Sequence, residues 1–423
     1  MLQRLSQPCR AFSAQPATPK LLQARTGGLL EIHINRPKVL NALSLPVIRA
    51  LRETLAPVNS GDAAVVCLQG AGGKAFCAGG DIKLMAGDLP LAPGKPAPKT
   101  SPGEPVQGQA QFDGQLSFFS EEYQVDTALA QSSRFKPWMA IWDGIVMGGG
   151  VGISIHLPVR VATENTVFAM PETGIGFFPD VGGSYWLSRM ADPGVGEYLA
   201  LAGARVKGAE ALRLGIATNF VLSERLPELK AKLAELPAGA SVADVRAVVA
   251  EVQAGPGEQA AIAAASSAWE PTVAAVGASF SKRSVEGIIR ELQDMESSAA
   301  DEHTAKWAKK TLKTLARMSP TSLKVTLEQL ARGKRLTRDD CYRMELHMAM
   351  NFMARPDFYE GVRALLVDKD NTPAWAAASL ADVTPDEVDA HFAPVEGVPT
   401  LQFLPTADLV DMSSLQFNTV ARQ

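Results

Sequence analysis

The chain has 423 residues, of which 46% are hydrophobic and 20% are charged, so we expect a packed globular core. Its formal net charge of −4 at pH 7 excludes a general electrostatic attraction to nucleic acid or to anionic membranes. Four scattered cysteines without CxxC spacing, and no apolar run of about 18 residues, argue against a cysteine-based metal or redox site and against a membrane span.

The N-terminal segment is basic and lacks acidic residues, because the first acid is Glu31. Arg10 precedes Phe12 and Ser13 by the spacing that is common at mitochondrial processing sites. We therefore predict a disordered mitochondrial transit peptide over residues 1–26 and a location in the mitochondrial matrix. A basic tail without a targeting role is the alternative.

A β-α-β unit is predicted next. Residues 30–35 alternate between apolar and polar side chains, as in a half-buried strand. Ser44 can cap a following helix with an apolar face, and residues 63–68 form a short apolar run that predicts a central parallel strand. Such a unit favours a right-handed crossover.

Two glycine-rich turns each follow a predicted strand. The first, over residues 70–82, has no Gly-Lys-Ser/Thr sequence of a phosphate-binding loop but can present a free backbone N–H. The second, Gly148-Gly149-Gly150, follows an apolar strand predicted over residues 138–146 and precedes a predicted helix start at 151–155. Two such turns could direct two amides at one oxygen, as an oxyanion site requires. The alternative is a pair of tight turns that only allow close packing.

Two acidic residues follow the second turn in apolar surroundings. Glu172 lies in the sequence AMPE and Asp180 in the sequence FFPD. Burial would raise the pKa of either carboxyl. Together with the glycine turns, they indicate a catalytic site rather than a purely structural one.

The chain resembles the crotonase (enoyl-CoA hydratase/isomerase) superfamily and, within it, the 3-hydroxyisobutyryl-CoA hydrolases of valine breakdown. The resemblance covers roughly residues 29–392. It is carried by the sequences AGGDI at 78–82, FFSEEY at 118–123, MGGG at 147–150, FAMPET at 168–173, FPDVGG at 178–183, MSPTSLK at 318–324 and EGVRALLVDKD at 360–370.

The resemblance implies a role for five residues. The oxyanion amides of the family fall on Gly80 and Gly149, and its acyl-pocket glutamate falls on Glu122. The carboxylate that acts on the thioester falls on Glu172, either as nucleophile or as general base, and its hydrolase-specific partner falls on Asp180. These five residues are also the predicted substrate-binding and catalytic set.

One departure from the hydratases favours hydrolysis. Where hydratases carry the first of two catalytic glutamates, this chain has Gly152, and where they usually have glycine it has Asp180. Addition of water across a double bond needs both glutamates, so we expect thioester hydrolysis instead.

The remaining segments are predicted from composition. Residues 85–114 are rich in proline and predict a long loop, which could overhang the thioester pocket or be a solvent loop. We expect a helix at 207–214, a strand at 216–221, an alanine-rich helical stretch at 227–278, and amphipathic helices at 285–292 and 303–318.

A basic stretch lies between residues 303 and 338, where ten lysines and arginines accompany a single acid, Glu328. Three interpretations stay open: a solvated helix face, a site for the phosphates of coenzyme A, or a contact with RNA.

The sequence therefore predicts an α/β fold with a crotonase-type core of repeated ββα units over residues 27–224. A helical C-terminal region over 225–395 and a tail over 396–423 complete the predicted organisation. The expected activity is hydrolysis of 3-hydroxyisobutyryl-CoA, and also of 3-hydroxypropionyl-CoA, with no metal and no cofactor beyond the coenzyme A of the substrate. The alternatives are a structural component of the mitochondrial small ribosomal subunit and, third, an enoyl-CoA hydratase or isomerase. The resemblance also allows a homo-oligomer.

Overall fold

The structure is a computed structural model that describes residues 19–87, 108–298 and 301–403. Its centre is a six-stranded sheet in the order β1-β2-β3-β5-β7-β10, in which β1 pairs antiparallel with β2 and the other neighbours are parallel. The strands of this sheet are β1 Leu21–Thr26, β2 Leu29–Ile34, β3 Val65–Gly70, β5 Trp138–Trp142, β7 Val159–Ala162 and β10 Asn219–Phe220.

A smaller second sheet has the order β4-β6-β8-β9, and its first three strands are parallel. Its strands are β4 Ala75–Cys77, β6 Ile145–Met147, β8 Val167–Ala169 and β9 Val206–Lys207. The chain passes from the large sheet to the small one three times, from β3 to β4, from β5 to β6 and from β7 to β8. This alternation confirms the predicted ββα repeats.

The prediction of a single strand over residues 138–146 is wrong, because this run is divided between β5 and β6. Gly144 has a φ of +118°, and a β-carbon there would lie 2.5 Å from the carbonyl oxygen of Lys74. This glycine bends the chain between β5 and β6, so the apolar run contributes to both sheets.

Short helices and 3₁₀ turns connect the strands of the core. They are η1 Pro37–Val39, α1 Leu45–Ser60, α2 Ile82–Ala86, α3 Gln109–Ser132, α4 Gly149–Ile155, η2 Glu172–Ile175, α5 Gly183–Trp186, η3 Leu187–Arg189, α6 Val195–Ala202, α7 Glu210–Arg213 and η4 Ser223–Arg225. The β2-α1-β3 unit and the helix start after the glycine triplet confirm two predictions. The helix predicted at 207–214 begins only at Glu210, because Lys207 pairs in β9, and the strand predicted at 216–221 shortens to β10.

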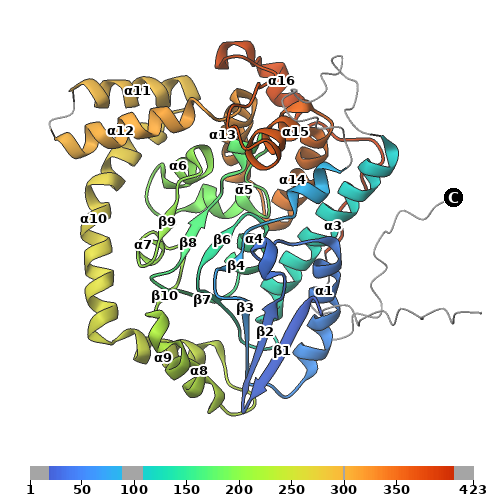
Figure 1. The fold of residues 1–423 in the computed structure, drawn as a ribbon, viewed down its shortest axis with the longest axis vertical. Helices are drawn as coiled ribbons and strands as arrows, with labels where there is room; N and C mark the ends of the chain where they lie inside the picture. Colours follow the sequence, from blue (N-terminus) through green and yellow to red (C-terminus); the bar gives the residue numbers. More distant parts are fainter. Residues whose placement is uncertain (1–18, 88–107, 299–300, 404–423) are drawn as a thin grey trace, which may run out of the picture.

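The C-terminal part is mainly helical and wraps around the side of the core opposite α1 and α3 and over one end of it (Figure 1). Its elements are α8 Leu226–Ala234, α9 Val242–Gln253, α10 Pro256–Phe280, α11 Val285–Ser298, α12 Glu302–Leu315, α13 Pro320–Gly333, α14 Arg338–Met353, α15 Pro356–Val362, the π-turn η5 Arg363–Val367, η6 Leu380–Asp382 and α16 Pro385–Ala390. Helices α8 and α9 cover one face of the large sheet with a separate apolar cluster that includes Leu229 and Val249. Helix α10 then runs along one edge of the molecule to the α11–α12 hairpin.

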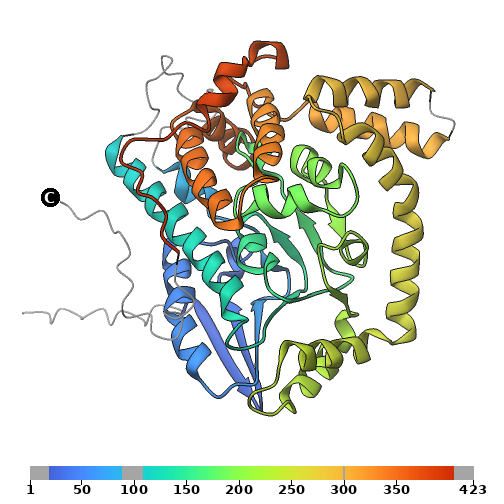
Figure 2. The same ribbon diagram turned by 180° about the vertical axis from the view of Figure 1, so that it is seen from behind.

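Helices α13 to α16 return to the core (Figure 2). Helix α14 packs along α3, and α13 packs against α5 and α6. One buried apolar cluster contains residues from Ile32 to Leu401, so the core elements and these helices share their interior. The predicted boundary between residues 224 and 225 stays a prediction.

The structure corrects the predicted bounds of the N-terminal leader and of the C-terminal tail. Residues 21–26 form β1 rather than part of a disordered leader, and residues 1–18 lie outside the described residues. At the other end, Leu401 is buried and the ring of Phe403 contacts Tyr342, whereas residues 404–423 are outside the description. Of the proline-rich stretch at 85–114, the ends belong to α2 and α3, and residues 88–107 are not described. No helix among the described residues is both long and apolar enough to cross a bilayer.

Candidate active site

The two predicted glycine turns lie against each other. A β-carbon added at Gly79 would lie 3.7 Å from the backbone nitrogen of Gly149, and one added at Gly149 would lie 3.4 Å from that of Gly80. The N–H of Leu43 donates to the carbonyl oxygen of Gly79, and the carbonyl oxygen of Leu43 accepts the N–H of Asp81. The N–H of Gly80, between these two residues, takes no part in this pairing. Gly149 opens α4, so its N–H has no partner within that helix.

Glu172 and Glu122 approach the second turn from different elements. Glu172 begins η2 after β8, and its Oε1 would lie 3.0 Å from a β-carbon at Gly148. Glu122 belongs to α3, and its Oε1 would lie only 2.3 Å from a β-carbon at Gly149. Side chains at these glycines would displace the carboxyls, so the glycines are required for close approach as well as for the turn.

Asp126 is a third buried carboxyl, one helical turn after Glu122 on α3. A β-carbon at Gly152 would lie 2.6 Å from Asp126 Oδ2 and 2.6 Å from Val181 Cβ. The space beside position 152 is therefore already filled, and no glutamate side chain can be accommodated there without displacing both neighbours.

Asp180 follows η2 in a tight turn. The hydroxyl of Tyr123 on α3 donates a hydrogen bond of 2.9 Å to Asp180 Oδ2. The next residue, Val181, has a φ of +52°, which is the left-handed region that a β-branched side chain rarely adopts. Such a conformation costs about 1–3 kcal/mol and persists only where the surrounding structure holds it.

Burial controls the titration of these acids. It raises the pKa of Glu172 well above 4.5, and the nearby Asp180 raises it further. It raises the pKa of Asp180 from 3.8 to about 7, against the hydrogen bond from Tyr123, which lowers it. For Glu122 the cause is again burial first, followed by the charges of Asp126 and Asp180.

The carboxyl cluster also lacks compensating partners. Among the described residues, no lysine, arginine or histidine forms an ion pair with any of the four acids. Buried Glu122 Oε1, Glu172 Oε2 and both oxygens of Asp126 have no hydrogen-bond partner in that part of the chain. Buried polar atoms are normally satisfied, so unpartnered oxygens beside two free amides are typical of a site that receives a polar ligand.

A groove of about 780 Å³ borders the first glycine turn. Met85 and Phe118 line it, and the same two side chains would lie 3.1 and 3.3 Å from a β-carbon at Gly80. None of the four carboxyls lines the groove. Its size suits the elongated part of a ligand whose reacting end reaches the glycine turns.

Comparison with known proteins agrees with this geometry. The family model described as enoyl-CoA hydratase/isomerase matches residues 29–392. The chain belongs to the enoyl-CoA hydratase/isomerase family. It is 40% identical over 387 residues to the protein named 3-hydroxyisobutyryl-CoA hydrolase, mitochondrial, of Rattus norvegicus, covering 90% of each chain. Identity to the protein of the same name from Dictyostelium discoideum is 36% over 399 residues, covering 93% of this chain and 96% of the other.

Solved structures of the family have the same fold. A carnitinyl-CoA dehydratase from Mycobacterium thermoresistibile superposes with a TM-score of 0.73 at 32% identity, covering 91% of this chain and 99% of that one. An enoyl-CoA hydratase from Rhodobacter sphaeroides gives a TM-score of 0.70 at 28% identity, covering 91% and 100%. The predicted crotonase-type fold is thereby confirmed.

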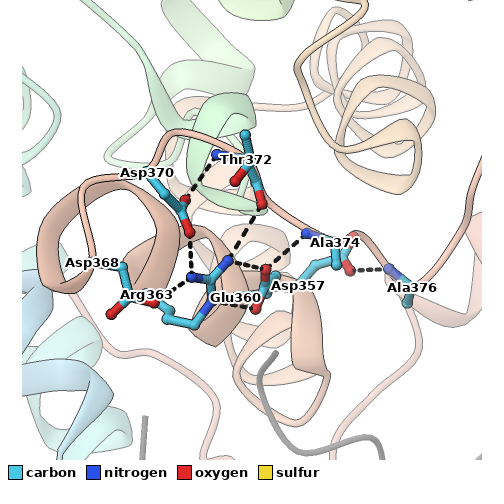
Figure 3. A network of polar contacts seen from close by, with 8 residues as sticks. All are labelled: Asp357, Glu360, Arg363, Asp368, Asp370, Thr372, Ala374 and Ala376. Atoms are coloured by element: carbon cyan, nitrogen blue, oxygen red, sulfur yellow. Dashed lines mark hydrogen bonds and ion pairs between the residues drawn. The ribbon is translucent and has the colours of Figure 1, made fainter. Parts of the chain in front are cut away.

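Two glycines allow helix α15 to contact the η2 turn that carries Glu172 at close range. Gly176 and Gly361 allow backbone contact between η2 and α15, because β-carbons there would lie 2.3 Å from the Asp357 oxygen and 2.4 Å from the Ile175 carbonyl. Figure 3 shows a polar network at the end of α15. In it Arg363 pairs with Glu360, Asp368 and Asp370, and Asp357 and Glu360 accept backbone N–H bonds from Ala376 and Ala374. The charged residues of the EGVRALLVDKD sequence at 360–370 thus hold the end of α15 to the segment that follows it.

Five of the ten basic residues in the stretch at 303–338 form ion pairs. The pairs are Lys306–Glu302, Lys309–Glu296, Lys324–Glu286, Arg332–Glu328, Arg332–Asp389 and Arg338–Asp339. None of its ten basic residues lines the groove. This arrangement favours the solvated helix face over a phosphate site.

Sequence reasoning placed all five proposed site residues together but missed three others, namely Tyr123, Asp126 and Glu345. Asp126 lies four residues after Glu122, so helical spacing could have indicated it, whereas Tyr123 directly follows Glu122 and helical spacing does not place it on the same face. Glu345 on α14 accepts the backbone N–H groups of Gly182 and Ser184, but it lies far along the chain and nothing in its local sequence distinguishes it.

Proposed function

We propose that this chain hydrolyses 3-hydroxyisobutyryl-CoA, and also 3-hydroxypropionyl-CoA, to the free acid and coenzyme A. Relatives of that name are 36–41% identical over about nine-tenths of the chain. The observation that carries the proposal is the filled space beside Gly152, where Asp126 and Val181 leave no room for a second hydratase glutamate. Hydrolysis needs no such group.

The mechanism assigns each step to residues of this chain. The Gly80 and Gly149 amides bind the thioester oxygen as negative charge develops on it. Glu172 then attacks the carbonyl carbon or deprotonates a water that does so, and its raised pKa makes it a stronger base once ionised. The C–S bond breaks, the sulfur leaves with its electron pair as a thiolate, and a proton from the Asp180 carboxyl neutralises it. If Glu172 is the nucleophile, water then cleaves the mixed anhydride that it forms, which frees the acid and restores the Glu172 carboxylate. The proton that this water gives up replaces the one lost by Asp180.

Glu122 is proposed to bind the hydroxyl of the acyl group. Its Oε1 is unpartnered and lies against Gly149, next to the oxyanion amides. A hydroxyl bonded there would fix the acyl chain with its carbonyl at the two glycine turns. No metal or cofactor enters this scheme, because coenzyme A arrives as part of the substrate.

Release of coenzyme A from 3-hydroxyisobutyryl-CoA, followed with a thiol reagent, tests the proposal. We expect rapid release by the wild-type chain and a loss of about a thousandfold or more in Glu172→Ala with unchanged circular dichroism. Near-normal turnover in that variant would refute the assignment. Hydroxylamine should trap an acylated Glu172 only if this residue is the nucleophile.

The remaining predictions are tested separately. Hydration of crotonyl-CoA at a rate comparable with thioester hydrolysis would favour the hydratase alternative. The names of the relatives support a mitochondrial location, which we extend to the matrix as part of the proposal. Homo-oligomers and association with the mitochondrial ribosome stay predictions that gel filtration and co-sedimentation with ribosomes in low and high salt would test.

A further inference from the structure

The backbone turn that carries Asp180 is held by a buried glutamate from the C-terminal helices. Glu345 lies in the middle of α14 and is fully buried. Its Oε2 accepts the N–H of Gly182 at 2.7 Å, and its Oε1 accepts the N–H of Ser184 at 2.8 Å. Both carboxylate oxygens therefore bind the chain just after Asp180.

Two further side chains hold the same turn. Gln329 on α13 donates to the carbonyl oxygen of Pro179 at 2.7 Å, just before Asp180. Tyr342, one helical turn before Glu345, donates to the carbonyl oxygen of Val181 at 3.3 Å. The backbone is thus bonded on both sides of Asp180 by side chains that lie 150 to 163 positions along the chain from the groups they bond.

The local chain does not account for this turn without such bonds. Val181 adopts a φ of +52°, which its own side chain disfavours. Among the described residues, the one side chain that hydrogen-bonds the Asp180 carboxyl is Tyr123, at Oδ2, so the direction of this carboxyl also depends on its backbone. A buried glutamate is also a costly way to fill space: burial raises the pKa of the Glu345 carboxyl from 4.5 to about 8, a cost that an apolar side chain would avoid.

We propose that Glu345 is a positioning residue for thioester hydrolysis, fixing the strained turn so that the Asp180 carboxyl faces Glu172. This inference rests on the proposed function. The two acids interact electrostatically in the folded chain. Loss of the Glu345 bonds lets the turn relax and moves Asp180, while the glycine amides, Glu122 and the groove stay in place.

The test uses Glu345→Gln in the full chain, with Glu258→Gln as a matched control. The glutamine keeps the volume and one acceptor oxygen but turns an NH₂ group toward a backbone N–H. Glu258 is on α10, remote from the carboxyl cluster, and is 1% exposed. It accepts the N–H of Leu222 at 3.3 Å and forms an ion pair with Arg225 of η4. Both variants replace a buried carboxyl group by an amide, but only the first touches the Asp180 turn.

The readouts are kcat, KM and amide exchange. For Glu345→Gln we expect kcat to fall about 10- to 100-fold with KM within about threefold of wild type, because the substrate contacts persist while the acid is misplaced. Amide exchange should accelerate in the peptide that covers residues 180–186. The control should keep its kcat, with exchange changed only around residues 220–228.

A kcat within twofold of wild type in Glu345→Gln, or unchanged exchange at 180–186, would overturn the inference. If Glu345→Gln does not fold, Tyr342→Phe replaces it as the test, because this variant removes only the hydrogen bond to Val181. We expect Tyr342→Phe to lower kcat about two- to tenfold. An unchanged kcat in this variant would count against the proposal. If the wild-type chain itself releases no coenzyme A, the proposed function fails, whereas the exchange measurement still reports on the turn.

Discussion

Replacing Asp180 by asparagine should stabilise the fold in a manner that depends on pH. The substitution keeps the size of the side chain and an oxygen that accepts the Tyr123 hydroxyl. It removes a carboxyl whose pKa burial raises from 3.8 to about 7. Because native Asp180 binds its proton more tightly than the unfolded chain does, its contribution to stability is fully present below pH 3.8 and is lost as pH rises through 7.

The size of the effect follows from the two pKa values. One pKa unit corresponds to 1.36 kcal/mol, so a rise from 3.8 to about 7 amounts to about 4 kcal/mol once the carboxyl is ionised in both states. About 1.6 kcal/mol of this is already lost at pH 5, which leaves a change of about 3 kcal/mol between pH 5 and pH 8. Removal of the charge also relieves Glu172, which acts in the same direction.

Urea unfolding of wild type and Asp180→Asn at pH 5 and pH 8 measures this difference. We expect the variant to gain about 3 kcal/mol relative to wild type between the two pH values, while hydrolysis falls sharply. Asp294→Asn, an exposed change on α11, is the control and should alter the free energy of unfolding by less than about 0.5 kcal/mol at either pH. An Asp180→Asn effect that is the same at both pH values would refute the assignment of a strained, buried charge.

Three further outcomes are expected. Gly152→Ala should lower the free energy of unfolding by about 1–3 kcal/mol because its β-carbon would contact Asp126 at 2.6 Å, and a smaller effect in combination with Asp126→Ala would confirm the contact by urea unfolding. Arg363→Met should cost about 3–5 kcal/mol in the same assay, since it leaves buried Glu360 without its cation; a loss below about 1 kcal/mol would contradict the network. Glu122→Gln should raise KM about tenfold for 3-hydroxyisobutyryl-CoA but leave KM for isobutyryl-CoA unchanged, and an equal rise for both would exclude a contact with the hydroxyl.

The repeating core was predicted from the resemblance to the family, and the local sequence signals predicted individual parts of it. Glycine turns after apolar strands predicted where Gly80 and Gly149 lie, and the buried surroundings of Glu172 and Asp180 were apparent from their neighbours. The break at Gly144 was missed because an apolar run carries no sign of the sheet to which it belongs.

The parts that were not predicted depend on distant contacts. Asp126 can fill the space beside Gly152 only because α3 packs against α4 and brings the Asp126 carboxyl to that position. The ion pairs of the basic stretch use acids outside it, such as Glu286, Glu296 and Asp389, so the charge excess within residues 303–338 overstated the available positive charge. A count of charges along the sequence cannot identify ion-pair partners that only the tertiary fold brings close.

The bond between Glu345 and Gly182 also has a consequence for the order in which the protein is made. The two residues are 163 positions apart, and synthesis at about 5–20 residues per second separates them by on the order of 10–30 s. During that interval the nascent chain already contains both glycine turns and Glu172 but not the helix that holds the Asp180 turn. Because α14 also belongs to the buried core that the sheets share, hydrolase activity should appear only after the C-terminal helices have been synthesised.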